Sequence, residues 1–500
     1  MQLQEATIAE LQHAMEEGEL SSRQLTEWYI KRIQQLDKEG PSLHAIIEIN
    51  PEALEIATAL DQERALKGKR GPLHGIPVLL KDNIATADRM ETTAGSLALL
   101  GARPIRDAYV AQQLRAAGAI ILGKTNLSEW ANIRSSDSSS GWSARGGQCR
   151  NPYILDRTPS GSSSGSAVAV SANLVTVSLG TETDGSILSP ASTNGVVGIK
   201  PTVGLTSRAG VIPISHSQDT VGPFARTVTD AAIVLGAITG IDEHDTATYS
   251  NSGQSHKDYT QFLVADGLRG ARIGVARQTY FGRNEKVQKL INLAIQYMQE
   301  QGAIIIDPAN IFTSEQMAAS ESEMTVMLYE LKADMHTYLS ELEQAPVHGL
   351  QDIIDFNREH SDEEMPFFGQ DIFEQAQQTP GLDAPRYQNA LAENHRLSRE
   401  EGIDKIMDTY QLDALVAPTC GPAWCIDHAN GDLFTGVNTQ ATALSGYPAV
   451  SVPAGYIFDL PVGITFMGRA YSEPTLLKLA YAFEQATHQR KEPQYLPTAK

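Results

Sequence analysis

Serine hydroxyls gather in one short tract, TPSGSSSGSAVAV (158–170), and a serine becomes a nucleophile once a base removes its proton. Gly/Ser-rich composition is typical first of a flexible linker. The tract also fits the G-x-S-x-G pattern of an α/β-hydrolase, with Ser163 as the nucleophile between Gly161 and Gly165. A third interpretation joins the tract to two other segments of the chain.

The flanking residues separate these interpretations. A linker continues in polar residues, but this tract runs directly into SAVAVSANLVTVSLGTETDGS (166–186), which predicts a small-residue helix, a strand and a second glycine loop. A nucleophile elbow needs a strand leading into it, and YILDRTPS (153–160), with Pro159 and charged residues, makes a poor central strand. Its partner histidine would have to come from the C-terminal region, where His488 lies in a helical pattern.

The third interpretation takes GIPVLLKDN (75–83), the Ser/Gly tract and GTETDGSILSPA (180–191) together. This combination resembles the amidase signature family in order, spacing and flanking pattern. The resemblance implies a catalytic triad of Lys81, Ser162 in a cis peptide, and Ser186 as the nucleophile. As in that family, the two serines are 24 residues apart. The resemblance also implies an oxyanion hole made by backbone N–H groups, those of Thr183, Asp184, Gly185 and Ser186.

Amide hydrolysis explains what these residues would do. An amide is a poor electrophile, so the serine needs a base, and no histidine lies in the three motifs. The resemblance assigns that role to Lys81, acting through Ser162. A lysine with a pKa of about 10.4 is rarely neutral at pH 7, but burial lowers this value. Lys81 ends the apolar run Ile76–Leu80, which predicts burial, and Asp82 is expected to point to the opposite face.

Three segments point to one branch of the family. NLSEWAN (126–132), GWSARGGQCRNPY (141–153) and GTETDGS (180–186) resemble the bacterial peptide amidases, which hydrolyse C-terminal carboxamides of peptides. Two alternatives remain: the amidase subunit of a tRNA-dependent amidotransferase, which releases ammonia from glutamine, and a non-catalytic scaffold of the same fold.

The sequence departs from the common family pattern near the proposed nucleophile. Ser160 and Ser164 stand where glycines are usual, Asp184 replaces a glycine and Glu182 replaces an aspartate. Leu188 occupies a position that is often arginine, so the Asp–Arg ion pair common near this loop is expected to be absent. The resemblance therefore leaves open how the loop is supported.

Alternating strand and helix patterns predict the fold class. Short apolar runs predict strands at 76–80, 119–123, 272–276, 303–307, 413–417, 449–453 and 461–468. Helical periodicity separates them at 107–118, 284–301 and 474–488. The expected architecture is α/β: a single large mixed sheet covered by helices on both faces, with a helical insertion.

Pattern changes suggest four regions. Residues 1–60 are expected to be a helical segment packing on the core: Thr7 and Ser21 begin capping boxes, and Asn50-Pro51 predicts a helix start. Residues 61–309 and 411–500 are expected to form the core. The stretch 310–410, charged and without strand signals, is expected to be a mostly helical insertion or lid-like region.

Composition excludes several classes of function. The net charge of −21 over 500 residues argues against a nucleic-acid partner. The resemblance implies a small-molecule or peptide amide substrate instead. Three cysteines form neither a disulfide framework nor a zinc pattern, and no signal peptide or membrane span is evident. We expect no membrane partner, cofactor or metal, and a cytoplasmic protein as the chain is written. A removed export signal would leave no trace, and the oligomeric state is not encoded in any motif.

Overall fold

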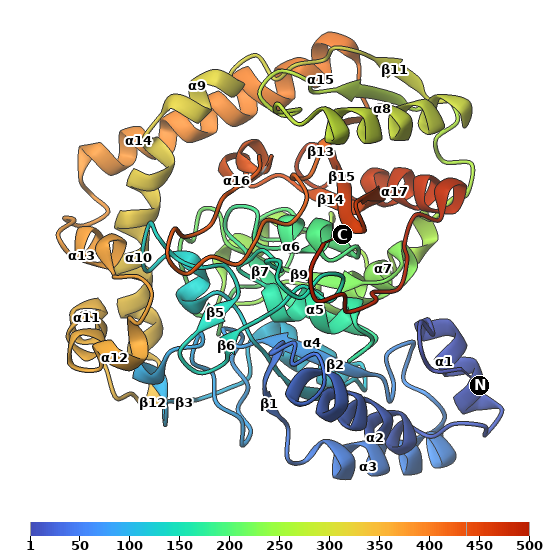
Figure 1. Ribbon diagram of the computed structural model, residues 1–500, viewed down its shortest axis with the longest axis vertical. Helices are drawn as coiled ribbons and strands as arrows, with labels where there is room; N and C mark the ends of the chain where they lie inside the picture. The colour runs from blue at the N-terminus through green and yellow to red at the C-terminus, as the bar shows by residue number, and fades with distance from the viewer. Residues whose placement is uncertain (1, 437, 500) are drawn as a thin grey trace.

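A mixed sheet of 11 strands runs through the computed structural model, which describes residues 2–436 and 438–499 (Figure 1). In spatial order the strands are β1 (Ile46–Ile49), β4 (Ile120–Thr125), β2 (Pro77–Lys81), β7 (Val177–Glu182), β9 (Thr220–Ala225), β8 (Val197–Lys200), β14 (Ala449–Ile457), β15 (Leu460–Met467), β13 (Ala414–Pro418), β10 (Arg272–Val275) and β11 (Ile304–Ile306). The β4–β2–β7 and β13–β10–β11 neighbours are parallel and the other pairs antiparallel. The predicted mixed sheet is confirmed.

Helices cover both faces of this sheet, as the sequence predicts. On the central strands, α5 (Ser164–Ser171) packs against α6 (Leu188–Thr193). A second connected layer contains α4 (Tyr109–Ala116), α7 (Val228–Ile238), α17 (Glu473–Thr487) and α8 (Glu285–Glu300). Every residue of β2, β7 and α5 is buried, because helices leave no face of these central elements open to water.

The parallel pairing of β2 with β7 places the functional segments at one edge. Leu80 lies opposite Leu179, so the two strands end within about two residues of each other at the same edge of the sheet. Carboxyl ends of parallel strands meet at one edge, where side chains leave the packed interior and enter the loops. Lys81 ends β2, and the glycine loop before Ser186 follows β7 directly. The topology therefore brings together segments that are about a hundred residues apart.

The N-terminal segment is mostly helical, with two differences from expectation. Both capping boxes are present, at Thr7 before α1 (Ile8–Glu16) and at Ser21 before α2 (Ser22–Arg32). Residues 46–49, however, form β1, the edge strand of the sheet. The helix α3 (Ala53–Lys67) begins after the expected site, because the Asn50 side chain accepts a hydrogen bond from the Glu52 N–H and forms a turn first.

The region 310–410 is largely helical and lies along the left and top of the molecule in Figure 1. Its helices are α9 (Ser314–Ala319), α10 (Ser322–Ser340), α11 (Leu350–Glu359), α12 (Ser361–Glu364), α13 (Asp371–Gln377), α14 (Pro385–His395) and α15 (Asp404–Tyr410). Contrary to expectation it also contains a strand, β12 (Leu342–Gln344), which pairs with β3 (Arg103–Pro104). The division of the chain into four regions remains a prediction.

No helix in the described part of the chain combines the length and apolar character needed to cross a bilayer.

Candidate active site

Lys81 is fully buried and its amine faces the Ser/Gly tract. The Nζ atom donates to Ser162 Oγ at 2.7 Å and to Thr181 Oγ1 at 2.8 Å. Burial lowers the pKa of Lys81 to about 7, although the charges of Asp219 and Glu182 act in the opposite direction. A lysine with this pKa is about half neutral at pH 7, so it can accept a proton there.

Asp82, next in sequence to Lys81, faces away from it as expected. Its carboxylate accepts hydrogen bonds from Thr93 Oγ1 at 2.6 Å and the Gly95 N–H at 3.2 Å, and it pairs with Arg145. The Asp82 carboxylate is therefore held by these three groups rather than by Lys81.

The Ser/Gly tract is a buried part of the fold rather than a linker. The peptide bond between Gly161 and Ser162 is cis, and Ser162 is fully buried beside Lys81. The Ser163 hydroxyl donates to the carbonyl of Thr181 at 2.9 Å and accepts from its N–H at 3.2 Å. Both contacts tie Ser163 to the backbone of β7. They favour a structural role for this serine and count against the elbow interpretation.

Ser186 lies in the loop between β7 and α6, with 8 % of its surface exposed. The Ser163 N–H donates to the Ser186 carbonyl at 3.2 Å, so the two serine loops are joined through the backbone. Among the described residues, the Ser162 and Ser186 hydroxyls are not hydrogen-bonded to each other. Gly185 has φ of +77°, a conformation that favours glycine and lets the chain turn sharply before Ser186.

The four predicted N–H groups of Thr183–Ser186 all belong to this turn. None of them donates to a protein acceptor in residues 2–436 or 438–499. Such N–H groups are the donors that stabilise the oxyanion of a tetrahedral intermediate when they converge.

Two buried carboxylates, those of Glu182 and Asp219, hydrogen-bond to residues of the loop around Ser186. Glu182 Oε2 accepts from the N–H groups of Ile187 at 2.6 Å and Leu188 at 2.8 Å. Asp219 Oδ1 accepts from Thr183 Oγ1 at 2.5 Å, and burial raises the pKa of Asp219 to about 6. Glu182 therefore fixes the backbone that follows Ser186, and Asp219 holds the Thr183 side chain that precedes it.

Sequence reasoning missed several residues of this site. Thr181 contacts Lys81 and Asp219 contacts the loop. Thr181 lies within the motif 180–191 but has no predicted role, and Asp219 lies in none of the three motifs. Asp219 lies in a different segment, and only the antiparallel pairing of β7 with β9, opposing Glu182 to Thr220, brings it to the loop. The sequence around Asp219 therefore carries no local signal of this role.

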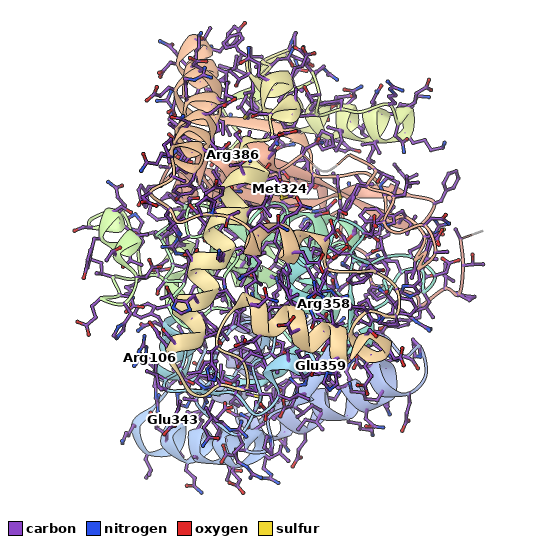
Figure 2. All side chains as sticks on the ribbon, turned by 90° about the vertical axis from the view of Figure 1, so that its left-hand side faces the viewer. Arg106, Met324, Glu343, Arg358, Glu359 and Arg386 are labelled. Carbon is purple, nitrogen blue, oxygen red and sulfur yellow. The ribbon has the colours of Figure 1, made fainter. Side chains whose placement is uncertain are left out.

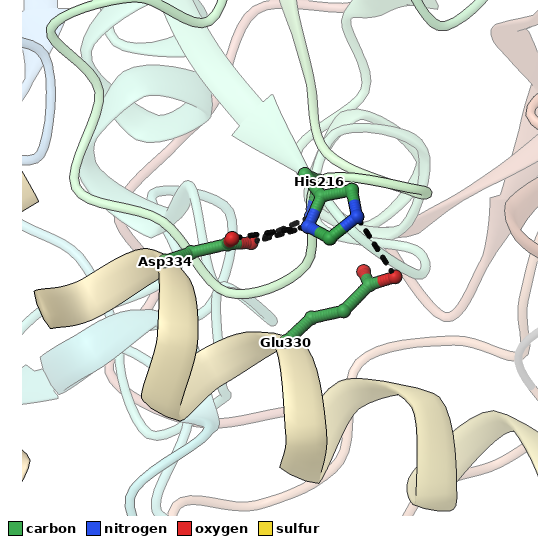
Figure 3. A group of neighbouring side chains, drawn as sticks. All are labelled: His216, Glu330 and Asp334. Carbon is green, nitrogen blue, oxygen red and sulfur yellow. Dashed lines mark hydrogen bonds and ion pairs between the residues drawn. The ribbon is translucent and has the colours of Figure 1, made fainter. Parts of the chain in front are cut away.

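Three histidines are candidates for an alternative base, His74, His216 and His488, and they have separate environments. His74 is fully buried and its Nε2 lies 3.0 Å from the Leu60 carbonyl, which fits a structural role. His488 ends α17. His216 lies between Asp334 and Glu330 of α10, as Figure 3 shows.

Within the described residues, the side chains of His216, Glu330 and Asp334 form a group that could hold a metal ion. Their potential ligand atoms all lie within 4.8 Å of one another. The geometry of this group, however, is that of an ion pair. Nδ1 lies 3.0 Å from Asp334 and Nε2 lies 3.3 Å from Glu330, so each ring nitrogen faces its own carboxylate (Figure 3). Burial lowers the pKa of His216, but the hydrogen bond to Asp334 and both negative charges outweigh it, and the pKa is raised.

Comparisons with known proteins agree with the motifs. The family model described as Amidase matches residues 24–477. The peptide amidase from Stenotrophomonas maltophilia, a solved structure, is 52% identical, with a TM-score of 0.94 over 98% of this chain and 99% of that one.

Curated relatives agree as well. A probable amidase from Arabidopsis thaliana is 47% identical, covering 99% of this chain and 92% of the relative. A glutamyl-tRNA(Gln) amidotransferase subunit from Halorhodospira halophila is 32% identical, over 98% of this chain and 99% of the relative.

The chain therefore belongs to the amidase signature family. It is an amidase, a hydrolase that acts on amide carbon–nitrogen bonds, and its large mixed sheet with covering helices is the fold of its peptide amidase neighbours.

Proposed function

We propose that this amidase hydrolyses the C-terminal carboxamides of peptides through a triad of Ser186, Ser162 and Lys81, forming an acyl-enzyme and releasing ammonia. The observation that carries the proposal is the 2.7 Å hydrogen bond from fully buried Lys81 to Ser162. The name of the Stenotrophomonas peptide amidase supports the substrate class.

The proposed reaction begins with attack of Ser186 Oγ on the amide carbonyl carbon. The Ser186 proton passes to Ser162 Oγ, whose own proton passes to neutral Lys81 Nζ. The tetrahedral oxyanion accepts hydrogen bonds from N–H groups of the loop Thr183–Ser186. Lys81 returns the proton through Ser162 to the amide nitrogen, the carbon–nitrogen bond breaks, and ammonia leaves. Water then attacks the ester by the same proton route and frees the carboxylic acid and Ser186.

Two substitutions test this triad. Ser186→Ala is expected to abolish ammonia release from a peptide amide while the protein keeps its circular dichroism spectrum and melting temperature. Lys81→Arg is expected to be equally inactive, because a guanidinium stays protonated and cannot act as a base. Near-normal turnover by the folded Ser186→Ala variant would exclude the proposed nucleophile.

A second candidate function is that of a glutamine amidase within a tRNA-dependent amidotransferase, favoured by the 32% identity to the Halorhodospira amidotransferase protein. A substrate panel separates the candidates: peptide amides, free glutamine, aryl amides and esters, each assayed for ammonia or acid release. Preference for glutamine, increased by a partner protein and tRNA, would favour the amidotransferase role. Labelling of Ser186 by a serine-directed phosphonate would exclude a non-catalytic scaffold.

A further inference from the structure

Two carboxyl groups, one from the loop that precedes Ser186 and one from α10, lie next to each other. The loop residue is Asp184, and its Oδ1 accepts a hydrogen bond from Thr439 Oγ1 at 2.5 Å. Its carboxyl group also lies beside that of Glu323, the second residue of α10. The inserted region 310–410 thus reaches a residue two positions from the proposed nucleophile.

Glu323 is held from two further elements. Gln218 Nε2 donates to Glu323 Oε1 at 3.1 Å, and Gln440 Nε2 donates to Oε2 at 2.9 Å. Each of these glutamines is adjacent in sequence to a residue that contacts the loop. Asp219, after Gln218, accepts a hydrogen bond from Thr183, and Thr439, before Gln440, donates one to Asp184. Both oxygens of Glu323 therefore accept hydrogen bonds from amide groups, and its carboxyl group lies beside Asp184.

The position of Glu323 on α10 fits this inward role. Met324, the next residue, is 38% exposed and lies on the outer side of the helix in Figure 2. Glu323 is turned toward the loop, as its contacts with Gln218 and Gln440 require. Its place at the start of α10 makes it the contact between the insertion and the Asp184 side chain.

Electrostatic repulsion favours protonation of this pair. Two neighbouring carboxylates repel each other, so a state in which they share one proton is favoured. Burial and the neighbouring Asp184 raise the pKa of Glu323 to about 8, and burial raises the pKa of Asp184. The other charged or titratable groups that act on Asp184 are Lys200, Glu182 and Tyr280.

Lys200 does not neutralise the carboxyl pair by direct contact. Its Nζ donates to the carbonyl of Tyr447 at 2.8 Å and to that of Pro201 at 3.3 Å, so it acts on the pair through space only. Its own pKa is lowered by burial to about 8, so a test must separate it from Glu323.

We propose that protonated Glu323 is a positioning residue for amide hydrolysis: it donates a hydrogen bond to Asp184, which holds the Thr183–Ser186 loop with its N–H groups facing the oxyanion. Loss of this proton at alkaline pH makes both groups negative, pushes Asp184 away and disorders the donors. The inference rests on the proposed function, since it assumes that the loop binds the oxyanion of a reaction at Ser186.

The expected pH profile has two limbs. Activity rises as Lys81 loses its proton near pH 7 and falls as Glu323 loses its own near pH 8. Above that pH, kcat should fall by about tenfold per pH unit, as for loss of one essential proton. KM should change less, because the oxyanion forms only in the transition state.

The test compares kcat and KM from pH 5.5 to 10.5 for the native enzyme, Glu323→Gln, Glu323→Ala and Glu321→Gln, with a peptide amide as substrate. Glutamine keeps a donor for Asp184 and carries no proton to lose, so its alkaline limb should disappear near pH 8 and its activity at pH 9.5 should exceed that of the native enzyme by about thirtyfold. Alanine removes the donor, so kcat should fall by at least about tenfold at every pH.

Glu321→Gln is the matched control. It removes one negative charge two residues away, from an exposed side chain at the N-cap of α10 that does not contact Asp184. Its profile should equal that of the native enzyme. Lys200 is unchanged in all variants, so an alkaline limb that depends on Lys200 would persist in Glu323→Gln.

An alkaline limb at the same pH in Glu323→Gln and the native enzyme would overturn the inference. Phosphonate labelling of native Ser186 needs no variant, and its rate should also fall above about pH 8; a continued rise would overturn the inference as well. Ser186→Ala separates the two proposals: activity in that variant refutes the proposed function, whereas an inactive Ser186→Ala with an unmoved Glu323→Gln limb refutes only the role of Glu323.

Discussion

Lys81→Met is expected to stabilise the protein at neutral pH while abolishing its activity. Lys81 is fully buried and its pKa is lowered to about 7, whereas the unfolded chain has the ordinary value of 10.5. Between pH 7 and pH 10.5 the unfolded chain therefore binds a proton that the folded protein does not. In this window the stability of the native protein rises with pH, because the unfolded state binds more protons.

The size of the effect follows from these two pKa values. Keeping Lys81 neutral costs about 4 kcal/mol of folding free energy at pH 7 and about 1.5 kcal/mol at pH 9.5. Methionine has no such cost, but it loses the hydrogen bonds to Ser162 and Thr181, worth about 1 kcal/mol each. The variant should therefore be more stable by about 2 kcal/mol at pH 7, and this advantage should vanish by pH 9.5.

Urea unfolding of both proteins at pH 7 and pH 9.5 measures the difference. Lys289→Met is the matched control, since Lys289 is exposed on α8 and its replacement should give no pH-dependent difference. A stability difference between Lys81→Met and the native protein that stays constant from pH 7 to pH 9.5 would refute the argument. It would mean that Lys81 keeps its proton in the folded state and is not the proposed base.

Two further substitutions test the surroundings of the triad. Asp219→Asn removes a negative charge that raises the pKa of Lys81, so the acid limb of kcat/KM should move to lower pH; an unmoved or higher limb in the pH profile would contradict this. Gly165→Ala should lower stability by about 3 kcal/mol, because an added Cβ would lie 2.2 Å from the Ala45 carbonyl oxygen and 2.6 Å from that of Asn126. A melting temperature equal to that of the native protein would show that the tract is less tightly packed than its contacts imply.

The sequence predicts most of the sheet because buried strands leave a local signal. Apolar runs at 76–80 and 272–276 became β2 and β10 within a residue or two, since strands buried on both faces must be apolar throughout. The edge strand β1 was missed: its residues pair on one side only, and they follow two helices in a segment with helical caps. The strand β12 was also missed, because its three residues gain their partner β3 only through the folded arrangement of the insertion.

The proposed triad could be located from sequence because each member lies in a motif with its own spacing. The residues that surround the triad could not be located from the sequence. Asp219 reaches Thr183 through the pairing of β7 with β9, and Glu323 reaches Asp184 from a helix more than a hundred residues away. A carboxylate in such a position has no local pattern, since its function depends on a partner that only the tertiary structure supplies.

Glu182 and Leu188 depart from the common family pattern together, and their contacts give a joint physical reason. An aspartate paired with arginine would be supported by charge. Here Leu188 packs in an apolar cluster that includes Tyr280 and Ala309, where a guanidinium would have no water. The longer Glu182 side chain instead reaches the backbone N–H groups of Ile187 and Leu188. Since hydrogen bonds from two N–H groups stabilise a buried carboxylate, the loop before Ser186 keeps its anchor without an ion pair.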